Sequence, residues 1–364
     1  MSYAERLKLG ELSANSAGSG SRCCLAESGG LLRRNNAVAL IRPAGSAGDA
    51  ERTAVPEAPL KIAICTPVPD NGQELFQLLA ESAARLASGR HEVTIDFTCH
   101  GEAQRAALIA CGAALPIGRA HIVERAPPKF FHANSVTHSR CLNALFAGVD
   151  ADLAIICDYD MALVARDWDA LLVDQFTAKG VAVLGSPYAS DAPFTFKLPN
   201  DVTVSARRYQ GKVNCMFFAF APRDLKAKTD RLCDFGALYN EPSSIPLRFI
   251  SNPIESLCFG LPVGAFMHLD TGGLLPQLIE RHKLRQHVLT RRVRSYTVLT
   301  SARFPEDFPP HLLPEEYVLD DTPLVAHFRK GASKSESDNF TREMFARDVR
   351  AWIAGLLRPA AQAV

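Results

Sequence analysis

The stretch ADLAIICDYD, residues 151–160, joins an unbroken apolar run to two aspartates that are separated by one tyrosine. A short apolar run such as LAIIC is typical of a strand that is buried on both faces of a parallel sheet. Because buried charges are costly, Asp158 and Asp160 are expected to follow the strand and not to lie within it. In an extended segment their carboxylates would point to one side and Tyr159 to the other. The stretch therefore predicts a buried strand that ends in concentrated negative charge.

Segments on both sides of this strand alternate between strand and helix patterns. The predicted strands cover residues 60–68, 91–100, 119–125, 151–157 and 181–188. The predicted helices cover residues 73–89, 101–115, 132–149 and 166–180. This alternation predicts an α/β fold with an open, mostly parallel sheet and helices on both faces. Ligands of such sheets bind beyond the carboxyl ends of the strands, which is where the two aspartates stand.

Three regions differ in composition. Residues 1–58 are rich in Ala, Gly, Ser and Arg and are expected to be a flexible, disordered leader. Residues 59–335 hold the alternating pattern and are expected to form the main domain. Residues 336–364 include an amphipathic helix that is expected to pack on this domain. Its apolar positions are Phe340, Met344, Phe345, Val349, Trp352 and Ile353.

The overall composition excludes several classes of protein. Forty basic and thirty-nine acidic residues leave a formal charge of +1, so the chain lacks the footprint of a nucleic-acid-binding protein. The ten cysteines form no CxxC pair, which argues against a zinc ribbon or a disulfide scaffold. The sequence contains no apolar run of eighteen residues. We expect a cytoplasmic protein without a transmembrane segment, with peripheral membrane association left open.

The aspartate pair itself indicates a metal site. Two carboxylates held this close repel each other unless a positive charge lies beside them. Mg²⁺ and Mn²⁺ take oxygen ligands and commonly share their coordination with substrate phosphates. Asp158 and Asp160 therefore predict a divalent-metal and diphosphate site. The alternative is that both aspartates cap a helix or face water.

A series of segments in a fixed order resembles the GT-A glycosyltransferases, in particular the family-2-like enzymes that use nucleotide sugars. The segments are KIAICTPV (61–68), HSRCLNALFAGVDAD (138–152), IICDYD (155–160), KVNCMFFAFAPRDL (212–225), NPIESLCFGLPVGA (252–265) and VAHFRKGAS (325–333). The resemblance covers residues 60–333. It implies a GT-A-like fold with a nucleotide-sugar-binding half, residues 59–187, and an acceptor half, residues 188–335. The chain departs from the family pattern on the acceptor side, where Ile-Glu replaces Glu-Asp.

The resemblance implies a role for the aspartate pair and for three residues near the carboxyl end of the chain. Asp160 is implied to coordinate a Mn²⁺ or Mg²⁺ ion, and Asp158 to contact the metal or the ribose of the donor. His327 is implied to be a third metal ligand or a diphosphate contact. Arg329 and Lys330 follow it and are suited to phosphate oxygens.

Glu255 is implied to be the general base that deprotonates an acceptor hydroxyl. An ordinary glutamate that offsets a helix dipole is the alternative for this residue, and Asp234 and Asp270 are the other candidates for the base.

Further donor contacts are expected from two other segments. Arg140 and Asn143 lie three residues apart on one predicted helix and could reach the phosphate or the sugar of the donor. For Arg140, a solvated salt-bridge face is the alternative. Thr66 and Pro67, at the end of the first strand, are implied to border the nucleotide base.

Together these residues indicate a metal-dependent hexosyl- or related transferase. It would move a sugar from a nucleotide-diphospho-sugar to a hydroxyl of a glycan, lipid or protein acceptor, in surface or cell-envelope glycan synthesis. One alternative is a non-catalytic nucleotide-sugar-binding protein of the same fold. A nucleotidylyltransferase is disfavoured because TPVPDNGQEL, residues 66–75, has no basic residue to hold a triphosphate. A dehalogenase-like phosphatase is disfavoured because its motif would continue differently after Asp160.

Overall fold

The computed structural model describes seven stretches of the chain, and the structural statements refer to these residues. They are residues 58–126, 133–188, 211–228, 271–272, 275–300, 313–329 and 336–358. Apart from Ala58, the expected leader of residues 1–58 lies outside them. Residues 189–210 and 229–270, in the expected acceptor half, also lie outside them.

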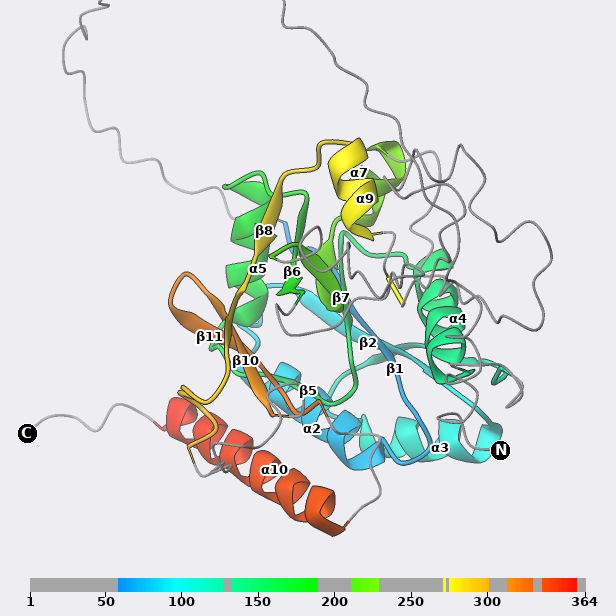
Figure 1. The fold of residues 1–364 in the computed structure, drawn as a ribbon, viewed down its shortest axis with the longest axis vertical. Helices are drawn as coiled ribbons and strands as arrows, with labels where there is room; N and C mark the ends of the chain where they lie inside the picture. The colour runs from blue at the N-terminus through cyan, green and yellow to red at the C-terminus, as the bar shows by residue number, and fades with distance from the viewer. Residues whose placement is uncertain are drawn as a thin grey trace, which may run out of the picture. The chain divides into compact units, whose positions relative to one another are not determined.

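The main sheet has seven strands in the order β3-β2-β1-β4-β7-β6-β8. The strands are β1 (Lys61–Pro67), β2 (Glu92–Cys99), β3 (Ile117–Ile122), β4 (Leu153–Cys157), β6 (Val183–Pro187), β7 (Val213–Phe220) and β8 (Gln286–Val288). All neighbouring pairs are parallel except those of β7, which runs antiparallel to both β4 and β6. The apolar run LAIIC is β4, at the centre of this sheet between β1 and β7, which Figure 1 labels. Each of its five residues is buried.

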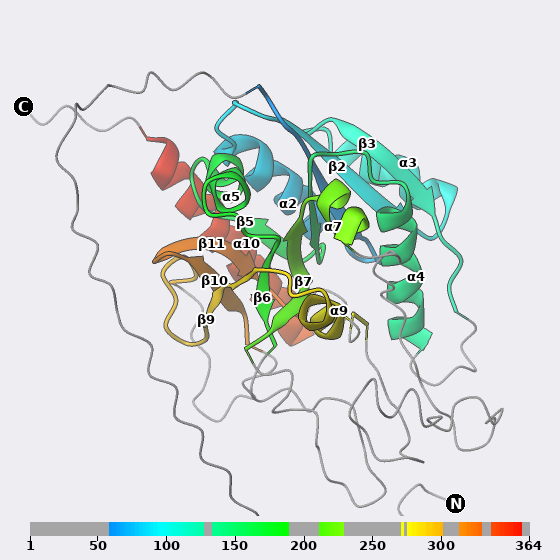
Figure 2. The same cartoon turned by 90° about the horizontal axis from the view of Figure 1, so that it is seen from above.

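Helices cover both faces of the main sheet. They are α2 (Gln73–Leu86), α3 (Glu102–Cys111), α4 (Ala133–Ala147), α5 (Trp168–Thr177), α7 (Pro222–Lys228), α9 (Leu275–Arg281) and α10 (Glu336–Leu357). Figures 1 and 2 show α10 and α4 far apart, on different sides of the strands. The predicted fold class, an open, mostly parallel sheet with helices on both faces, is confirmed.

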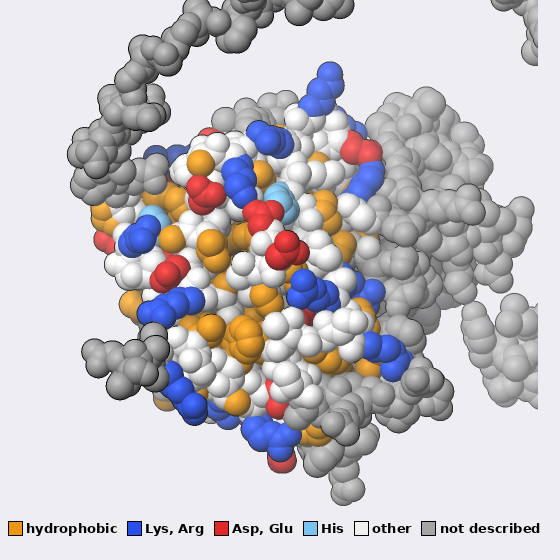
Figure 3. All heavy atoms as spheres, turned by 90° about the vertical axis from the view of Figure 1, so that its left-hand side faces the viewer, with side chains coloured by type: hydrophobic (Ala, Val, Ile, Leu, Met, Phe, Trp, Pro, Cys, Tyr) orange, Lys and Arg blue, Asp and Glu red, His pale blue; other side chains and the backbone are white. Residues whose placement is uncertain are grey.

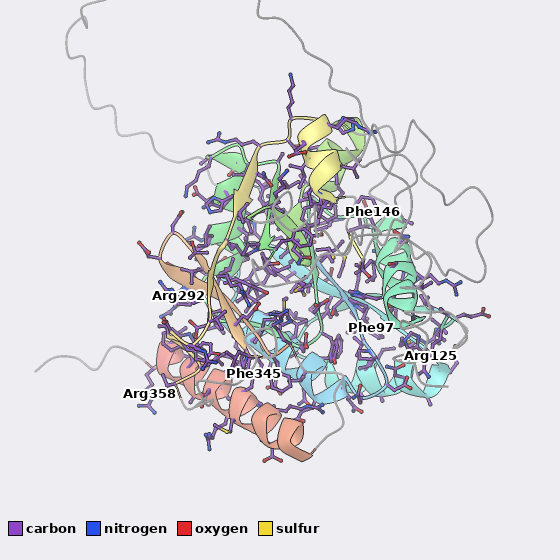
Figure 4. The ribbon with its side chains drawn as sticks, in the orientation of Figure 1. Phe97, Arg125, Phe146, Arg292, Phe345 and Arg358 are labelled. Atoms are coloured by element: carbon purple, nitrogen blue, oxygen red, sulfur yellow. The ribbon has the colours of Figure 1, made fainter. Side chains whose placement is uncertain are left out.

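Alternation along the strands produces two apolar cores. On β1, Ile62 and Ile64 belong to the core that includes α2, α3, α5 and α10, whereas Ala63 and Cys65 belong to the core that includes α4, α7 and α9. Successive side chains of a strand point to opposite faces, so one strand can supply both cores. In Figure 4, Phe345 from α10 represents the first core and Phe146 from α4 represents the second.

A second sheet of four strands was not predicted. Its order is β5-β11-β10-β9, with β5 (Met161–Leu163), β9 (Thr290–Arg292), β10 (Glu315–Leu319) and β11 (Thr322–His327). Each neighbouring pair is antiparallel. The strand β5 begins directly after Asp160, so the aspartate pair lies where the chain passes from the main sheet to the second sheet.

The predicted amphipathic helix of the C-terminal region is α10. Phe345, Val349 and Ile353 are buried against the first core, and the ring of Phe345 lies 5.4 Å from that of Phe328. The indole nitrogen of Trp352 donates a hydrogen bond to the Val164 carbonyl at 2.8 Å. Full burial of one such apolar side chain stabilises the folded state by about 1.5–3 kcal/mol. The helix therefore holds β5 and the second sheet against α2.

The surface of the described residues carries charges of both signs (Figure 3). On the face shown in Figure 3, acidic and basic side chains are interspersed with apolar ones, as expected for a nearly neutral chain. No helix within the described stretches is long and apolar enough to cross a bilayer.

The strand β3 begins and ends earlier than its predicted range of residues 119–125. Its pairing with β2 already starts at Pro116 and Ile117.

Candidate metal centre

The two aspartates lie in a tight turn between β4 and β5. The amide of Met161 donates a hydrogen bond to the Asp158 carbonyl at 3.3 Å, and Tyr159 and Asp160 are turn residues. The expectation of an extended segment was therefore wrong, because β5 must leave the main sheet within three residues. The ring of Tyr159 is buried among the residues of the first core.

Pairing between β5 and β11 brings His327 to this turn. His327 lies opposite Met161 in the antiparallel register, and the amide of Phe328 donates a hydrogen bond to the Asp160 carbonyl at 2.9 Å. These backbone contacts thus hold Asp160 and His327, which are 167 positions apart in the sequence, beside one another. This pairing depends on the second sheet and could not be read from the strand pattern.

The three side chains converge on one point. His327 Nε2 lies 3.4 Å from Asp160 Oδ1 and 3.9 Å from Asp158 Oδ2. One ligand atom from each of the three residues lies within 4.8 Å of the other two. Asp160 and His327 are buried, whereas the Asp158 side chain is 22% exposed. Two carboxylates and one imidazole suit a divalent cation such as Mn²⁺ or Mg²⁺, and exposed Asp158 leaves an approach for a ligand.

His138 on α4 is the other histidine of this centre. Its Nε2 lies 3.4 Å from Asp158 Oδ1, on the carboxylate oxygen that is not the one nearest His327. Its side chain is 31% exposed, so His138, like Asp158, can be reached from the solvent. Sequence reasoning missed this residue, although it begins the segment HSRCLNAL. The signal was a histidine in the first half of the helix that precedes the strand ending in Asp158 and Asp160.

Behind His327 lies a buried network from β9, β10 and β11. Glu315 is opposite His327 in the hairpin register. Its Oε1 accepts a hydrogen bond from Arg291 Nε at 2.6 Å and one from Arg329 Nη1. Its Oε2 accepts a hydrogen bond from the Tyr317 hydroxyl at 2.6 Å, and this hydroxyl lies 3.1 Å from His327 Nδ1. Glu315, Tyr317 and His327 are each at most 2% exposed.

Charges in this centre shift several pKa values. Burial acts to lower the pKa of His327, but the carboxylates of Asp160 and Glu315 outweigh it and raise the pKa to about 9. Burial acts to raise the pKa of Glu315, but His327, Arg329 and Arg291 hold it well below its usual range. Burial, followed by the nearby Glu315 carboxylate, raises the pKa of Tyr317 well above its usual value. Burial and the two aspartates raise the pKa of Tyr159 in the same way.

The remaining predicted donor contacts lie on β1 and α4. Thr66 and Pro67 end β1, where Pro67 is paired with Thr98 of β2. Thr66 is fully buried, and its hydroxyl has no hydrogen-bond partner among the described residues. Arg140 is exposed and Asn143 half-buried on α4. Their roles toward a donor stay predictions.

Arg329 faces Glu315, not the aspartates. Its side chain is 13% exposed, and its guanidinium forms an ion pair with the Glu315 carboxylate. A phosphate contact by Arg329 stays a prediction, and in this structure its charge already compensates a buried carboxylate. Lys330, the predicted base Glu255, and the other candidates Asp234 and Asp270 lie outside the described residues.

Comparisons with known proteins give likenesses in structure. No family model and no curated protein sequence matches the chain. Mouse xyloside xylosyltransferase 1, in its apo form, is 12% identical over 63% of this chain and 85% of its own, with a TM-score of 0.39. The mannosyltransferase PcManGT from Pyrobaculum calidifontis, in complex with GDP-Man and Mn²⁺, is 11% identical over 84% of this chain and 77% of its own, with a TM-score of 0.34.

A third similar structure is the glucosyl-3-phosphoglycerate synthase of M. tuberculosis. It is 16% identical over 47% of this chain and 60% of its own, with a TM-score of 0.32. Because all three TM-scores lie below 0.5, the function of the centre has to be argued from the strands and side chains of this chain.

Proposed function

We propose that the chain is a metal-dependent glycosyltransferase that moves a sugar from a nucleotide-diphospho-sugar to an acceptor hydroxyl. The observation that carries this proposal is the convergence of Asp158, Asp160 and His327 at the carboxyl end of β4. Ligands of open parallel sheets bind at this edge. A hexose is the expected sugar, and the acceptor belongs to surface or cell-envelope glycan synthesis.

The residues of the centre divide the work of binding between them. Asp160 and the Nε2 atom of His327 are the buried ligands of a Mn²⁺ or Mg²⁺ ion. Asp158, which is more exposed, contacts the metal or the donor ribose. The bound metal supplies positive charge that offsets the charge developing on the diphosphate leaving group. His138, which is partly exposed beside Asp158, is proposed to contact the same donor.

The acceptor side of the proposal concerns residues beyond this centre. Glu255 is the proposed general base. It would take the proton of the acceptor hydroxyl as the hydroxyl oxygen bonds to the anomeric carbon of the sugar, and the bond from this carbon to the diphosphate would break to release the nucleoside diphosphate. On the donor side, the proposed contacts are Arg140, Asn143, Thr66, Pro67, Arg329 and Lys330. Peripheral attachment to a membrane and a cytoplasmic location are part of the same proposal.

The proposal is tested with a panel of nucleotide sugars and Mn²⁺. Purified protein is incubated with each donor, and release of the nucleoside diphosphate is followed by chromatography with and without EDTA. We expect slow, metal-dependent hydrolysis of at least one donor, because water can replace a missing acceptor. Absence of both binding and hydrolysis across the panel would contradict the proposal.

Two variants separate the proposal from its alternatives. Glu255→Gln is expected to retain donor binding and to lose transfer, whereas a non-catalytic binding protein would bind a donor without turnover in either form. A nucleotidylyltransferase would instead release pyrophosphate from a nucleoside triphosphate and a sugar phosphate. Asp320→Asn serves as the matched control, since Asp320 lies in the exposed turn between β10 and β11 and pairs with Lys179 at 2.6 Å.

A further inference from the structure

The hydroxyl of Tyr317 stands between the candidate metal ligand His327 and the buried carboxylate of Glu315. The oxygen of Tyr317 lies 2.6 Å from Glu315 Oε2 and 3.1 Å from His327 Nδ1. Because Glu315 and Tyr317 are two residues apart on β10, they face the same side of the strand. All three side chains are buried, so the contacts are not exchanged with bulk water.

The charges around Glu315 determine the direction of these hydrogen bonds. Arg291 and Arg329 both donate to Glu315 Oε1, so the carboxylate is ionised and can only accept. The Tyr317 hydroxyl has a single proton, and it donates this proton in the short hydrogen bond to Glu315 Oε2. The oxygen of Tyr317 must then accept a hydrogen bond from the Nδ1–H group of His327. The direction of the hydrogen bond from His327 to Tyr317 therefore follows from the number of protons that each group can donate.

The position of the proton on the His327 ring determines which nitrogen can bind a metal. When a metal takes the place of the Nε2 proton, the imidazole is neutral with Nδ1 protonated, and the lone pair on Nε2 is the one that binds the metal. His327 Nε2 is the atom that faces Asp158 and Asp160. We propose that Tyr317, held in place by Glu315, is a positioning residue that directs the Nε2 lone pair of His327 toward the aspartates and thereby sets the affinity for the metal. This inference rests on the proposed metal site but assigns a role to residues that do not contact the metal.

The test uses Tyr317→Phe in the full-length protein. Mn²⁺ binding is measured by isothermal titration, with circular dichroism and thermal unfolding as checks of folding. Removing an outer hydrogen-bond partner of a metal-binding histidine typically weakens metal affinity about 10–100-fold, and we expect a loss in this range. The matched control is Tyr296→Phe. The Tyr296 hydroxyl donates a hydrogen bond to the Pro314 carbonyl at 2.8 Å, away from His327, so its removal is expected to change the Mn²⁺ affinity less than about twofold.

A double-mutant cycle separates positioning from general damage to the fold. If Tyr317 acts through His327, Tyr317→Phe has less than about a twofold effect on Mn²⁺ affinity in the His327→Ala background. An equal loss in both backgrounds, or no loss in the wild-type background, would overturn the inference. Asp160→Asn in the same titrations distinguishes this failure from failure of the metal site. If wild-type protein binds no Mn²⁺, or if Asp160→Asn binds it unchanged, the proposed function and the inference both fail.

Discussion

The two edges of the His327 ring face contrasting arrangements of carboxylates. On the Nδ1 side, Glu315 is buried and is paired with two guanidinium groups, which are fixed by β9 and by the residues after β11. On the Nε2 side, Asp158 and Asp160 lie together in a turn, where His327 Nε2 is 3.4 Å from Asp160 Oδ1 and His138 Nε2 is 3.4 Å from Asp158 Oδ1. Burial of an ion is tolerated where the surrounding protein supplies the opposite charge. The comparison predicts that Glu315 contributes mainly to folding, whereas the aspartate pair is the proposed site of a cation.

The largest expected effect tests the structural side of this comparison. Glu315→Gln removes the carboxylate that Arg291 and Arg329 share, so two largely buried guanidinium groups lose their compensating charge. Breaking a buried ion pair by removing one partner typically costs about 3–5 kcal/mol. We expect the free energy of unfolding in urea to fall by this amount. Glu92→Gln, at the exposed start of β2, is the control, and an equal small change in both variants would remove the distinction.

The second effect tests the opposite side of the ring. Asp160→Asn removes one charge from the candidate metal site and leaves the side-chain volume unchanged. We expect Mn²⁺ affinity, followed by electron paramagnetic resonance, to fall at least about 100-fold, which corresponds to about 2.7 kcal/mol. The free energy of unfolding in urea should change little, since the substitution relieves repulsion with Asp158 but also removes the attraction between Asp160 and the protonated His327. Mn²⁺ affinity equal to that of the wild type would show that the pair is not a metal site.

A third variant changes the turn without touching its charges. A Cβ atom on Gly72 would lie 2.8 Å from a ring carbon of Tyr159, so Gly72→Ala forces this ring, and the two aspartates beside it, to shift. Such overpacking typically costs about 1–3 kcal/mol. We expect lower stability together with a several-fold weaker Mn²⁺ affinity. Gly355→Ala on α10 has open space around the new methyl group and should leave the Mn²⁺ affinity as it is, so a matching loss there would refute the steric account.

The smallest effect extends the comparison to an exposed carboxylate. Asp320 forms an ion pair with Lys179, but its side chain is 56% exposed. Exposed pairs contribute about 0–1 kcal/mol because water and salt screen them. Asp320→Asn should therefore change the free energy of urea unfolding by less than about 1 kcal/mol. A loss as large as that of Glu315→Gln would mean that burial does not control the contribution of these ion pairs.

The sequence predicted the parts of the fold that depend on local pattern. The run LAIIC gave β4, because a strand buried on both faces has few polar positions. The leucines Leu75, Leu79 and Leu86 gave the buried face of α2, because a helix places every third or fourth residue on one side. The order of these elements was sufficient to place the aspartates at the carboxyl edge of the sheet.

The second sheet and its network could not be predicted in this way. β5 has three residues, too few for a periodic pattern, and it pairs with a strand more than 150 residues away. The turn after Leu319 pairs this residue with Thr322, and an unbroken hairpin would then place Glu315 opposite Ala326. A shift in register between Tyr317 and Val318 places Glu315 opposite His327 instead. A one-residue shift of this kind decides which side chains meet, and no pattern in the sequence marked it.

The central claim is that the aspartate pair, His327 and a divalent metal together form a site that a diphosphate completes. It is tested most directly by titrating the wild-type protein with uridine and guanosine diphosphates, with and without Mn²⁺, by isothermal calorimetry. We predict that Mn²⁺ tightens binding of at least one diphosphate by about tenfold or more, and that the diphosphate tightens Mn²⁺ binding by the same factor. This coupling should be absent from Asp160→Asn. Diphosphate affinities that are the same with and without Mn²⁺ would contradict the account.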